Sequence, residues 1–533
     1  MFQTTETLVF LLFVIAAVSA IAQRLKVPPA ILLVLTGVIF ALMPRLPAVQ
    51  LAPEVVLLLV LPPVIYAAAV AMSWREFRVS LRPISLLAVG CVVFTTVAAA
   101  AATHWLLGLP WAVGFTLGAI ISPPDAVAAL SILRRMQLPR RLIVILEGEG
   151  LANDATALIL YRFAVVAVSV GSFSFGHAVG TFAAIVVGEI LWGIGVGWTM
   201  LRLRHWADGP RTEILLSILT PFLAYWPPEY FGGSGVLATV ATGLYFSGNG
   251  LRLISAATRL QGIFFWDFFI YVIEGLVFLI TGLQARSLIA GISQYPISDL
   301  VTSAVVVSGV VILSRFVWMF PIAYLPRGIM RLFWHKHQEP SWQGSFVVAF
   351  AGIRGIVSLA AALAIPLVTA DGTPFPDRDL ILFLTFVVIL VTLVGQGLLL
   401  PWVIRMLGLA HAGRRERHAD KVEEIHARHQ AIEAVLRRLD QLTAERQLSQ
   451  DVVTPLRNRH RDRLRHADDR DGDSRQSQRV ATTEEIEFLL IAAERDSINE
   501  LYRTGQLKDE ARRRIERELD LRDAQLANLR AQD

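Results

Sequence analysis

Long apolar runs fill most of residues 1–410, and they limit the possible folds more than any other feature of the sequence. A helix needs about 20 apolar residues to cross the ~30 Å hydrocarbon layer of a bilayer. Apolar runs of span length lie near residues 7–23, 29–44, 54–72, 83–107, 111–133, 142–169, 178–201, 212–227, 234–247, 260–283, 299–325, 342–369 and 379–407. The sequence therefore predicts an all-α polytopic membrane protein with thirteen transmembrane helices.

Basic residues between these runs predict how the chain is oriented. If the N-terminus lies outside, the cytoplasmic loops contain seventeen Lys and Arg residues and the external loops contain three. Cytoplasmic loops of membrane proteins carry such an excess. Arg24 and Lys26 follow the first run and no basic segment precedes it, which favours a retained helix over a cleaved signal peptide. We expect a multi-pass protein of the cell membrane with its N-terminus outside and its C-terminus in the cytoplasm.

Charged residues make up only 17% of the chain and are concentrated after residue 410, whereas soluble proteins average about 25%. This contrast predicts a transmembrane domain at 1–410 and a cytoplasmic tail at 411–533, with helices near 416–448 and 483–530. The formal net charge of +5 would suit a nucleic-acid partner, but the arginines lie mostly in short loops and in a tail that also carries many acids. We therefore expect the lipid bilayer as the partner, and no nucleic acid.

Two of the apolar runs are interrupted near their middles. The fifth run reads WAVGFTLGAIISPPDAVAALSIL, and its two adjacent prolines remove two backbone donors just before Asp125. The twelfth run reads SFVVAFAGIRGIVSLAAALAIP, in which Gly352 and Gly355 flank Arg354. Interrupted helices at corresponding positions of two halves indicate the binding site of a transporter. Six runs, a linker and six more runs predict two inverted six-helix repeats whose discontinuous helices cross.

Charged groups also lie inside the sixth run, in EGEGLANDATALILY at 147–161. A helix rises 1.5 Å per residue, so Asp154 lies about 20 Å from the cytoplasmic end, and Asp125 reaches a similar depth from the other side. Desolvation favours the protonated form of a carboxylic acid, whereas a bound cation favours the ionised form. A proton and a Na⁺ ion would therefore compete for these two aspartates. Asn153 offers a neutral oxygen or a donor there, and Ser122 offers either a hydroxyl ligand or a structural cap.

The other charged groups in the runs need separate interpretations. Glu149 points away from the aspartates, and Arg354 is the sole charge of its run, so we expect these two side chains to form a structural ion pair. Glu147 lies seven residues before the second aspartate on the same helical face, nearer the cytoplasm, where it would line the entry to the site. Glu274 and Arg315 lie on the tenth and eleventh runs, where a structural pair is favoured over a role in transport.

Four segments together resemble a known family. They read GAIISPPDAVAA, EGEGLANDATAL, EGLVFLITGLQ and AGIRGIVSLAAALAIP, and they resemble the monovalent cation:proton antiporters of the NhaP and sodium/proton-exchanger branch. The resemblance covers about residues 5–410 and implies a thirteen-helix, inverted-repeat, NhaA-like fold and a homodimer. It also implies electroneutral exchange of Na⁺ or a similar ion for H⁺ by alternating access, without a cofactor, in sodium and pH homeostasis. The functional residues of the family correspond to Asp125, Asn153, Asp154, Glu149 and Arg354.

Two other classes of function use similar residues. An intramembrane aspartyl protease could pair Asp125 with Asp154 as a dyad that shares one proton. Arg354, the pair of broken helices and the lack of a Gly-x-Gly-Asp signature argue against this alternative. An ion channel, or an ion sensor that uses the tail as its output, could also need intramembrane charges. We expect a transporter rather than an enzyme, and the choice among Na⁺, Li⁺ and K⁺ stays open.

Overall fold

The computed structural model describes residues 2–43, 52–136, 138–170, 175–207, 209–254, 256–324 and 341–469, and short stretches between 486 and 523. The chain divides into two compact units, Met1–Arg414 and Arg415–Asp533. Arg45 and the basic loop at 325–340, which contribute to the predicted orientation, lie outside the described residues.

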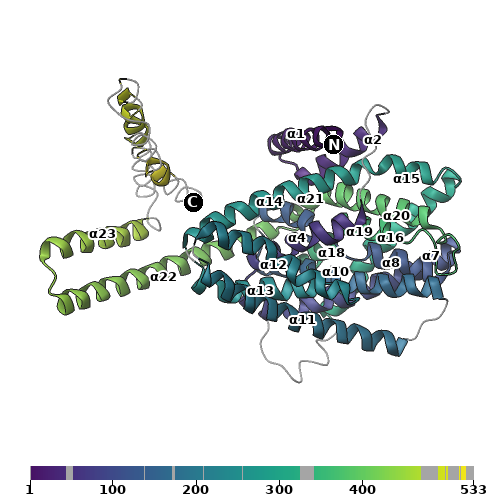
Figure 1. The fold of residues 1–533 in the computed structure, drawn as a ribbon, viewed down its shortest axis with the longest axis horizontal. Coiled ribbons are helices and arrows are strands. Elements are labelled where there is room, and N and C mark those ends of the chain that lie inside the picture. Colours follow the sequence, from purple (N-terminus) through teal and green to yellow (C-terminus); the bar gives the residue numbers. More distant parts are fainter. Residues whose placement is uncertain are drawn as a thin grey trace. The chain divides into compact units, whose positions relative to one another are not determined.

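The first unit is built from helices that follow the predicted apolar runs (Figure 1). They are α1 (Phe2–Leu25), α2 (Pro29–Leu42), α3 (Pro53–Val55), α4 (Leu61–Ala71), α5 (Trp74–Val79), α6 (Leu81–Ser85), α7 (Val92–Leu107), α8 (Trp111–Ile121), α9 (Ala126–Leu133), α10 (Arg140–Val170), α11 (Phe175–Trp206), α12 (Pro210–Tyr230), α13 (Val236–Leu253), α14 (Ala256–Leu283), α15 (Ala285–Gly291), α16 (Ile297–Tyr324), α18 (Trp342–Phe350), α19 (Ile356–Leu363), α20 (Arg378–Leu390) and α21 (Gly397–Met406). Short π-helical segments join α3 to α4, α6 to α7 and α20 to α21.

Within the described ranges, nine helical segments are long and apolar enough to cross a membrane. The protein is therefore an all-helical membrane protein, as the apolar runs predict. Four of the thirteen predicted runs contain helices outside these nine. α2 has only 14 residues, α12 and α13 carry more polar residues, and the twelfth run is divided into two short helices.

Both predicted helix breaks are confirmed. α8 ends at Ile121 and α9 begins at Ala126, because the two prolines between them cannot continue the hydrogen-bond ladder. α18 ends at Phe350 and α19 begins at Ile356, so the Gly-rich segment around Arg354 is extended rather than helical. Each break leaves the polar ends of two short helices inside an apolar bundle, where partners for them are needed.

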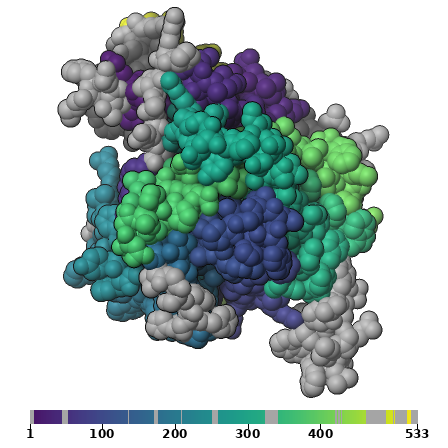
Figure 2. Space-filling model, turned by 90° about the vertical axis from the view of Figure 1, so that its right-hand side faces the viewer, coloured from purple at the N-terminus to yellow at the C-terminus, as the bar shows by residue number. Residues whose placement is uncertain are grey.

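The helices of the first unit pack as two sets. The broken-helix bundle contains α7–α10, α16 and α18–α21, and the flanking bundle contains α1, α2, α4 and α11–α14. α10 touches the flanking bundle through α4 and α13. Figure 2 shows how the chain mixes distant segments on one face: the segment near residue 100, in blue, is bordered by teal and green segments from beyond residue 260.

The described part of the tail is also helical. α22 (Leu409–Arg446) runs across the division between the units and covers the predicted helix near 416–448 except for its last two residues. It is followed by α23 (Gln450–Asp469), which the sequence analysis did not predict. The two helices lie side by side (Figure 1), and the Arg457 guanidinium meets the Asp440 carboxylate at 2.6 Å. The predicted helix at 483–530 lies largely outside the described residues.

Candidate functional site

The two helix breaks meet at Asp125. Its backbone N–H donates to the carbonyl of Ile353 in the other break at 2.6 Å. Its side-chain Oδ1 accepts the N–H of Val127 at 2.9 Å, which caps the N-terminus of α9. A Cβ on Gly355 would lie 1.8 Å from Oδ2 of Asp125, so only glycine allows the second break to approach this carboxylate. The α8–α9 break and the α18–α19 break therefore form one site.

Arg354 closes this site from the second break. Its fully buried guanidinium donates to the carbonyl of Ile121 at 2.9 Å, to the carbonyl of Ser122 at 3.3 Å and to that of Gly352. Its backbone N–H donates to the hydroxyl of Thr392 at 3.0 Å. The carbonyls at the end of α8 have no partners within their own helix, and a cation is favoured at that end of a helix. Arg354 therefore stabilises the broken ends through backbone acceptors.

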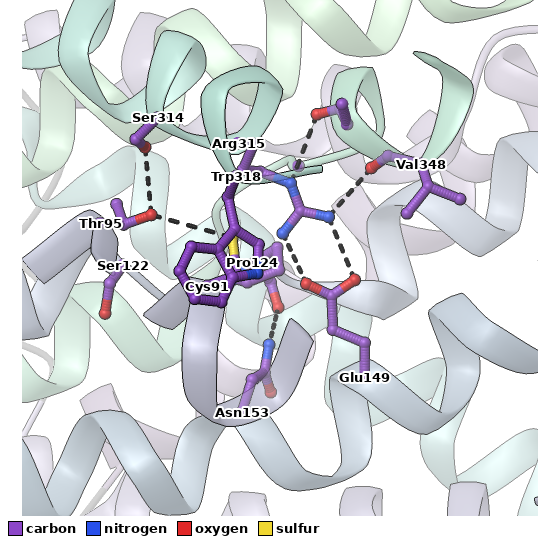
Figure 3. A network of polar contacts seen from close by, with 12 residues as sticks. Cys91, Thr95, Ser122, Pro124, Glu149, Asn153, Ser314, Arg315, Trp318 and Val348 are labelled. Carbon is purple, nitrogen blue, oxygen red and sulfur yellow. Dashed lines mark hydrogen bonds and ion pairs between the residues drawn. The ribbon is translucent and has the colours of Figure 1, made fainter. Parts of the chain in front are cut away.

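The predicted pairing of Glu149 with Arg354 is wrong, because Glu149 pairs with Arg315. The Arg315 guanidinium from α16 meets the two carboxylate oxygens of Glu149 at 2.5 and 3.1 Å (Figure 3). It also donates to the carbonyls of Val348 and Ala349 at 2.9 and 3.3 Å. Both charged side chains are only 1% exposed. Bidentate geometry and full satisfaction are what a buried ion pair requires.

The same contact rules out the predicted pair of Glu274 with Arg315. Charges counted run by run do not show that the backbone carbonyls at each break also need donors. The carbonyls of the first break accept the hydrogen bonds of Arg354, and Glu149 therefore forms its ion pair with Arg315. The end of α18 at the Gly-rich break was the available signal, since its last carbonyls require a donor from a neighbouring helix. Gly352 lies between the two arginines, and a Cβ there would be 2.6 Å from Nε of Arg315.

Asn153 ties α10 to the first break. Its Nδ2 donates to the carbonyl of Pro124 at 2.6 Å, and within the described residues its buried Oδ1 has no hydrogen-bond partner. The predicted role as a neutral donor agrees with this contact. Ser122 lies close by in the sequence and donates its hydroxyl to the carbonyl of Ala119 at 3.1 Å, a contact within its own helix. The carbonyls of Ser122 and Pro124 at the first break thus already accept hydrogen bonds from protein side chains.

Asp154 differs from the other acids of the site. It follows Asn153 on α10, is partly buried and lies close enough to Asp125 for the two carboxylates to interact electrostatically. In the part of the chain that the structure describes, no donor hydrogen-bonds to its carboxylate. An ionised carboxylate is costly to desolvate without a partner. Among the described residues, Asp154 is therefore the acid of this site without a hydrogen-bond donor, whereas Asp125 accepts the N–H of Val127 and Glu149 is paired with Arg315.

The two remaining predicted acids lie at the margins. Glu147 accepts a hydrogen bond from Arg134 at 2.9 Å on the predicted cytoplasmic side, where Arg134 is mostly exposed. Glu274 on α14 is partly buried and interacts electrostatically with Asp125 and Arg134. Glu274 is therefore within electrostatic range of the α8–α9 break, and Arg315 is paired with Glu149 instead.

Proteins of known families are similar to this chain in sequence and in fold. The family model described as "Sodium/hydrogen exchanger, transmembrane" matches residues 9–406. An uncharacterized Na(+)/H(+) exchanger of Mycobacterium tuberculosis is 35% identical over 535 aligned residues, covering 98% of this chain and 97% of that protein. A sodium, potassium, lithium and rubidium/H(+) antiporter of Bacillus subtilis is 33% identical, covering 74% of this chain and 60% of that protein.

The fold has a counterpart among solved structures. The sodium proton antiporter MjNhaP1 from Methanocaldococcus jannaschii matches with a TM-score of 0.63 and 20% identity, covering 76% of this chain and 99% of that one. The family match spans α1 to α21, and with them both helix breaks and every buried charge of the site. The chain belongs to the sodium/hydrogen exchanger family.

Proposed function

We propose that this chain is a secondary active transporter that exchanges Na⁺, or another monovalent cation, for H⁺ across the cell membrane by alternating access. The observation that carries the proposal is the carboxylate of Asp154, which has no donor among the described residues although its neighbour Asn153 is bonded to the helix break. The names of relatives that are 33% identical or more support monovalent cations as substrates. No cofactor enters the proposal beyond the transported ions.

In the proposed cycle, Asp154 alternates between its protonated form and a form that holds the cation. Asp125 supplies a second carboxylate, and the free Oδ1 of Asn153 supplies a neutral oxygen, which suits an alkali cation. Arg354 and the Glu149–Arg315 pair hold the breaks in place while the charge at Asp154 changes. One titratable acid beside a neutral amide supports the exchange of one H⁺ for one monovalent cation, which is electroneutral.

The finer architecture belongs to the same proposal. The nine span-length segments, together with α2, α12, α13 and the α18–α19 pair, would make thirteen transmembrane elements. Elements one to six and eight to thirteen would form two inverted repeats, and the contact between breaks at corresponding positions supports this arrangement. We further propose an external N-terminus, a cytoplasmic tail at 411–533 and a homodimer.

Proton movement in vesicles tests the proposed function. The purified protein is reconstituted in sealed liposomes that contain a pH-sensitive dye and an acidic interior, and NaCl is added outside. We expect the interior to become alkaline on addition of NaCl but not of choline chloride, because Na⁺ entry drives H⁺ exit. Clamping the membrane potential with K⁺ and valinomycin should leave the rate unchanged if exchange is electroneutral. Sodium uptake without proton movement would instead identify a channel.

Removing the tail tests the proposed division of labour. A chain that ends after Arg414 should still fold and exchange ions, because every site residue lies before the division between the units. Five of the eleven histidines lie beyond it, namely His418, His426, His429, His460 and His466. Since histidine titrates between about pH 5 and 8, we expect a changed dependence of the exchange rate on pH. Complete loss of exchange in a correctly inserted truncation would contradict the division.

A further inference from the structure

An ion pair joins the two bundles away from the candidate ion site. Arg162 of α10 forms an ion pair with Glu229 near the end of α12, and the two side chains are 33% and 26% exposed. α10 belongs to the broken-helix bundle, whereas α12 packs against α11, α13, α14 and α4 of the flanking bundle. The sequence positions are 67 residues apart, so the contact depends on how the two bundles sit against each other.

A buried carboxylate holds the chain that follows Glu229. Glu189 of α11 is buried, and its carboxylate accepts the backbone N–H groups of Ser234, Gly235 and Leu237 at 2.6, 3.2 and 3.1 Å. This fixes the turn that follows α12, and the N–H of Gly233 in that turn donates to the carbonyl of Pro228 at 2.8 Å. The buried charge of Glu189, which the ion site does not use, thereby holds the end of α12 against α11.

The pair lies between Asp154 and the proposed external side. Arg162 follows Asp154 by eight residues on α10, which is about 12 Å along the helix axis. Tyr225, one turn before Glu229 on α12, is buried in the same apolar cluster as Ala155 and Leu158 of α10. An apolar layer and then an ion pair therefore separate the carboxylate of Asp154 from the outer ends of both helices.

We propose that the Arg162–Glu229 ion pair is the outer gate of the transport path, and that it must separate before Asp154 is accessible from outside. Alternating access moves one bundle against the other around the ion site, so a contact that joins the bundles on one side holds that side closed. Arg162 and Glu229 are positioning residues, because neither touches the carboxylates that carry the ions. The inference rests on the proposed function and on the proposed external N-terminus.

Thiol labelling from outside tests the gate without requiring transport. The only cysteine, Cys91, is replaced by serine, and Leu158→Cys provides a reporter one turn beyond Asp154. A charged, membrane-impermeant maleimide is added to intact cells, and the rate of reporter labelling is measured. We expect Glu229→Gln and Arg162→Gln to raise this rate about two- to fivefold, the range that the loss of a partly exposed ion pair can produce.

A matched control is available at the other end of α10. The Arg140 guanidinium there meets the carboxylate of Glu76 at 2.7 and 3.0 Å, and Glu76→Gln should leave external labelling unchanged. The charge-swapped double variant Arg162→Glu with Glu229→Arg should restore the parent labelling rate, because it restores the ion pair. If one single variant does not fold, the other one still tests the gate.

Labelling of Glu229→Gln at the parent rate, or an equal increase in Glu76→Gln, would overturn the gate. Failure of the proposed function looks different. If the parent protein moves no protons in response to Na⁺ in liposomes, the proposed exchange is wrong, whatever labelling rates are measured. If the parent protein exchanges Na⁺ for H⁺ but Glu229→Gln is labelled at the parent rate, only the proposed gate is wrong.

Discussion

Asp154→Asn is expected to abolish sodium-driven proton movement while the protein still inserts and folds. The change preserves the shape of the side chain but removes both the titratable proton and the negative charge. Asn153 is already neutral and bonded to Pro124, so no acid would remain at this pair to alternate between a proton and a cation. An amide also costs less to bury than a carboxylate, and the melting temperature should not fall. Proton flux in sealed liposomes measures the loss.

The matched variant is Asp125→Asn. Asp125 already accepts the N–H of Val127 and serves as a helix cap, so we expect this residue to tune the site. The Asp125→Asn protein should therefore lose less activity than the Asp154→Asn protein. The parent protein should melt at a higher temperature when NaCl is added, because a ligand stabilises the state that binds it, and Asp154→Asn should lose this response. Retention of sodium-driven proton movement in Asp154→Asn would move the proton carrier to Asp125.

Arg315→Ala is expected to produce the largest loss of stability of any single change in the site. It leaves the carboxylate of Glu149, only 1% exposed, without its bidentate partner. Removing one partner of a buried ion pair costs about 3–5 kcal/mol. It also leaves the carbonyls of Val348 and Ala349 without their side-chain donor. Thermal melting of the purified protein in detergent should show a clear decrease, together with a lower yield of inserted protein.

The double variant Glu149→Leu with Arg315→Met tests whether the unpaired carboxylate of Glu149 causes this loss of stability. Replacing both charges by apolar side chains of similar volume removes the unpaired charge, so stability should recover relative to Arg315→Ala. A double variant that melts no higher than the single one would contradict a dominant role for the unpaired carboxylate. An Arg315→Ala protein that melts like the parent would show that Glu149 has another partner.

Much of the fold follows from local sequence chemistry. The apolar runs determine which segments become helices in a bilayer, and the two prolines before Asp125 and the glycines around Arg354 determine where two of those helices break. The tail was predicted less well, because α23 has a low content of apolar residues and contains Pro455. Its position beside α22 depends on contacts such as Arg457 with Asp440, which no local pattern reveals.

The sequence predicts which residues belong to the site, but it does not predict which of them form hydrogen bonds or ion pairs with each other. The converging positions of Asp125, Asn153 and Asp154 followed from depth along two helices, but the partner of Glu149 did not. Arg315 and Arg354 both lie beside Gly352, and the carbonyls freed at the breaks decide which of them pairs with Glu149. Backbone acceptors are not visible as residue types, which is why pairing charges run by run failed here.

Proton release on cation binding tests most directly the claim that H⁺ and Na⁺ compete for Asp154. Purified protein in detergent is placed in a weakly buffered solution with a pH-sensitive dye, and NaCl is added at a pH where the unliganded site is protonated. We predict release of about one proton per chain, since a bound cation favours the ionised carboxylate, and no release from Asp154→Asn. Equal release from the parent and from Asp154→Asn would contradict the account.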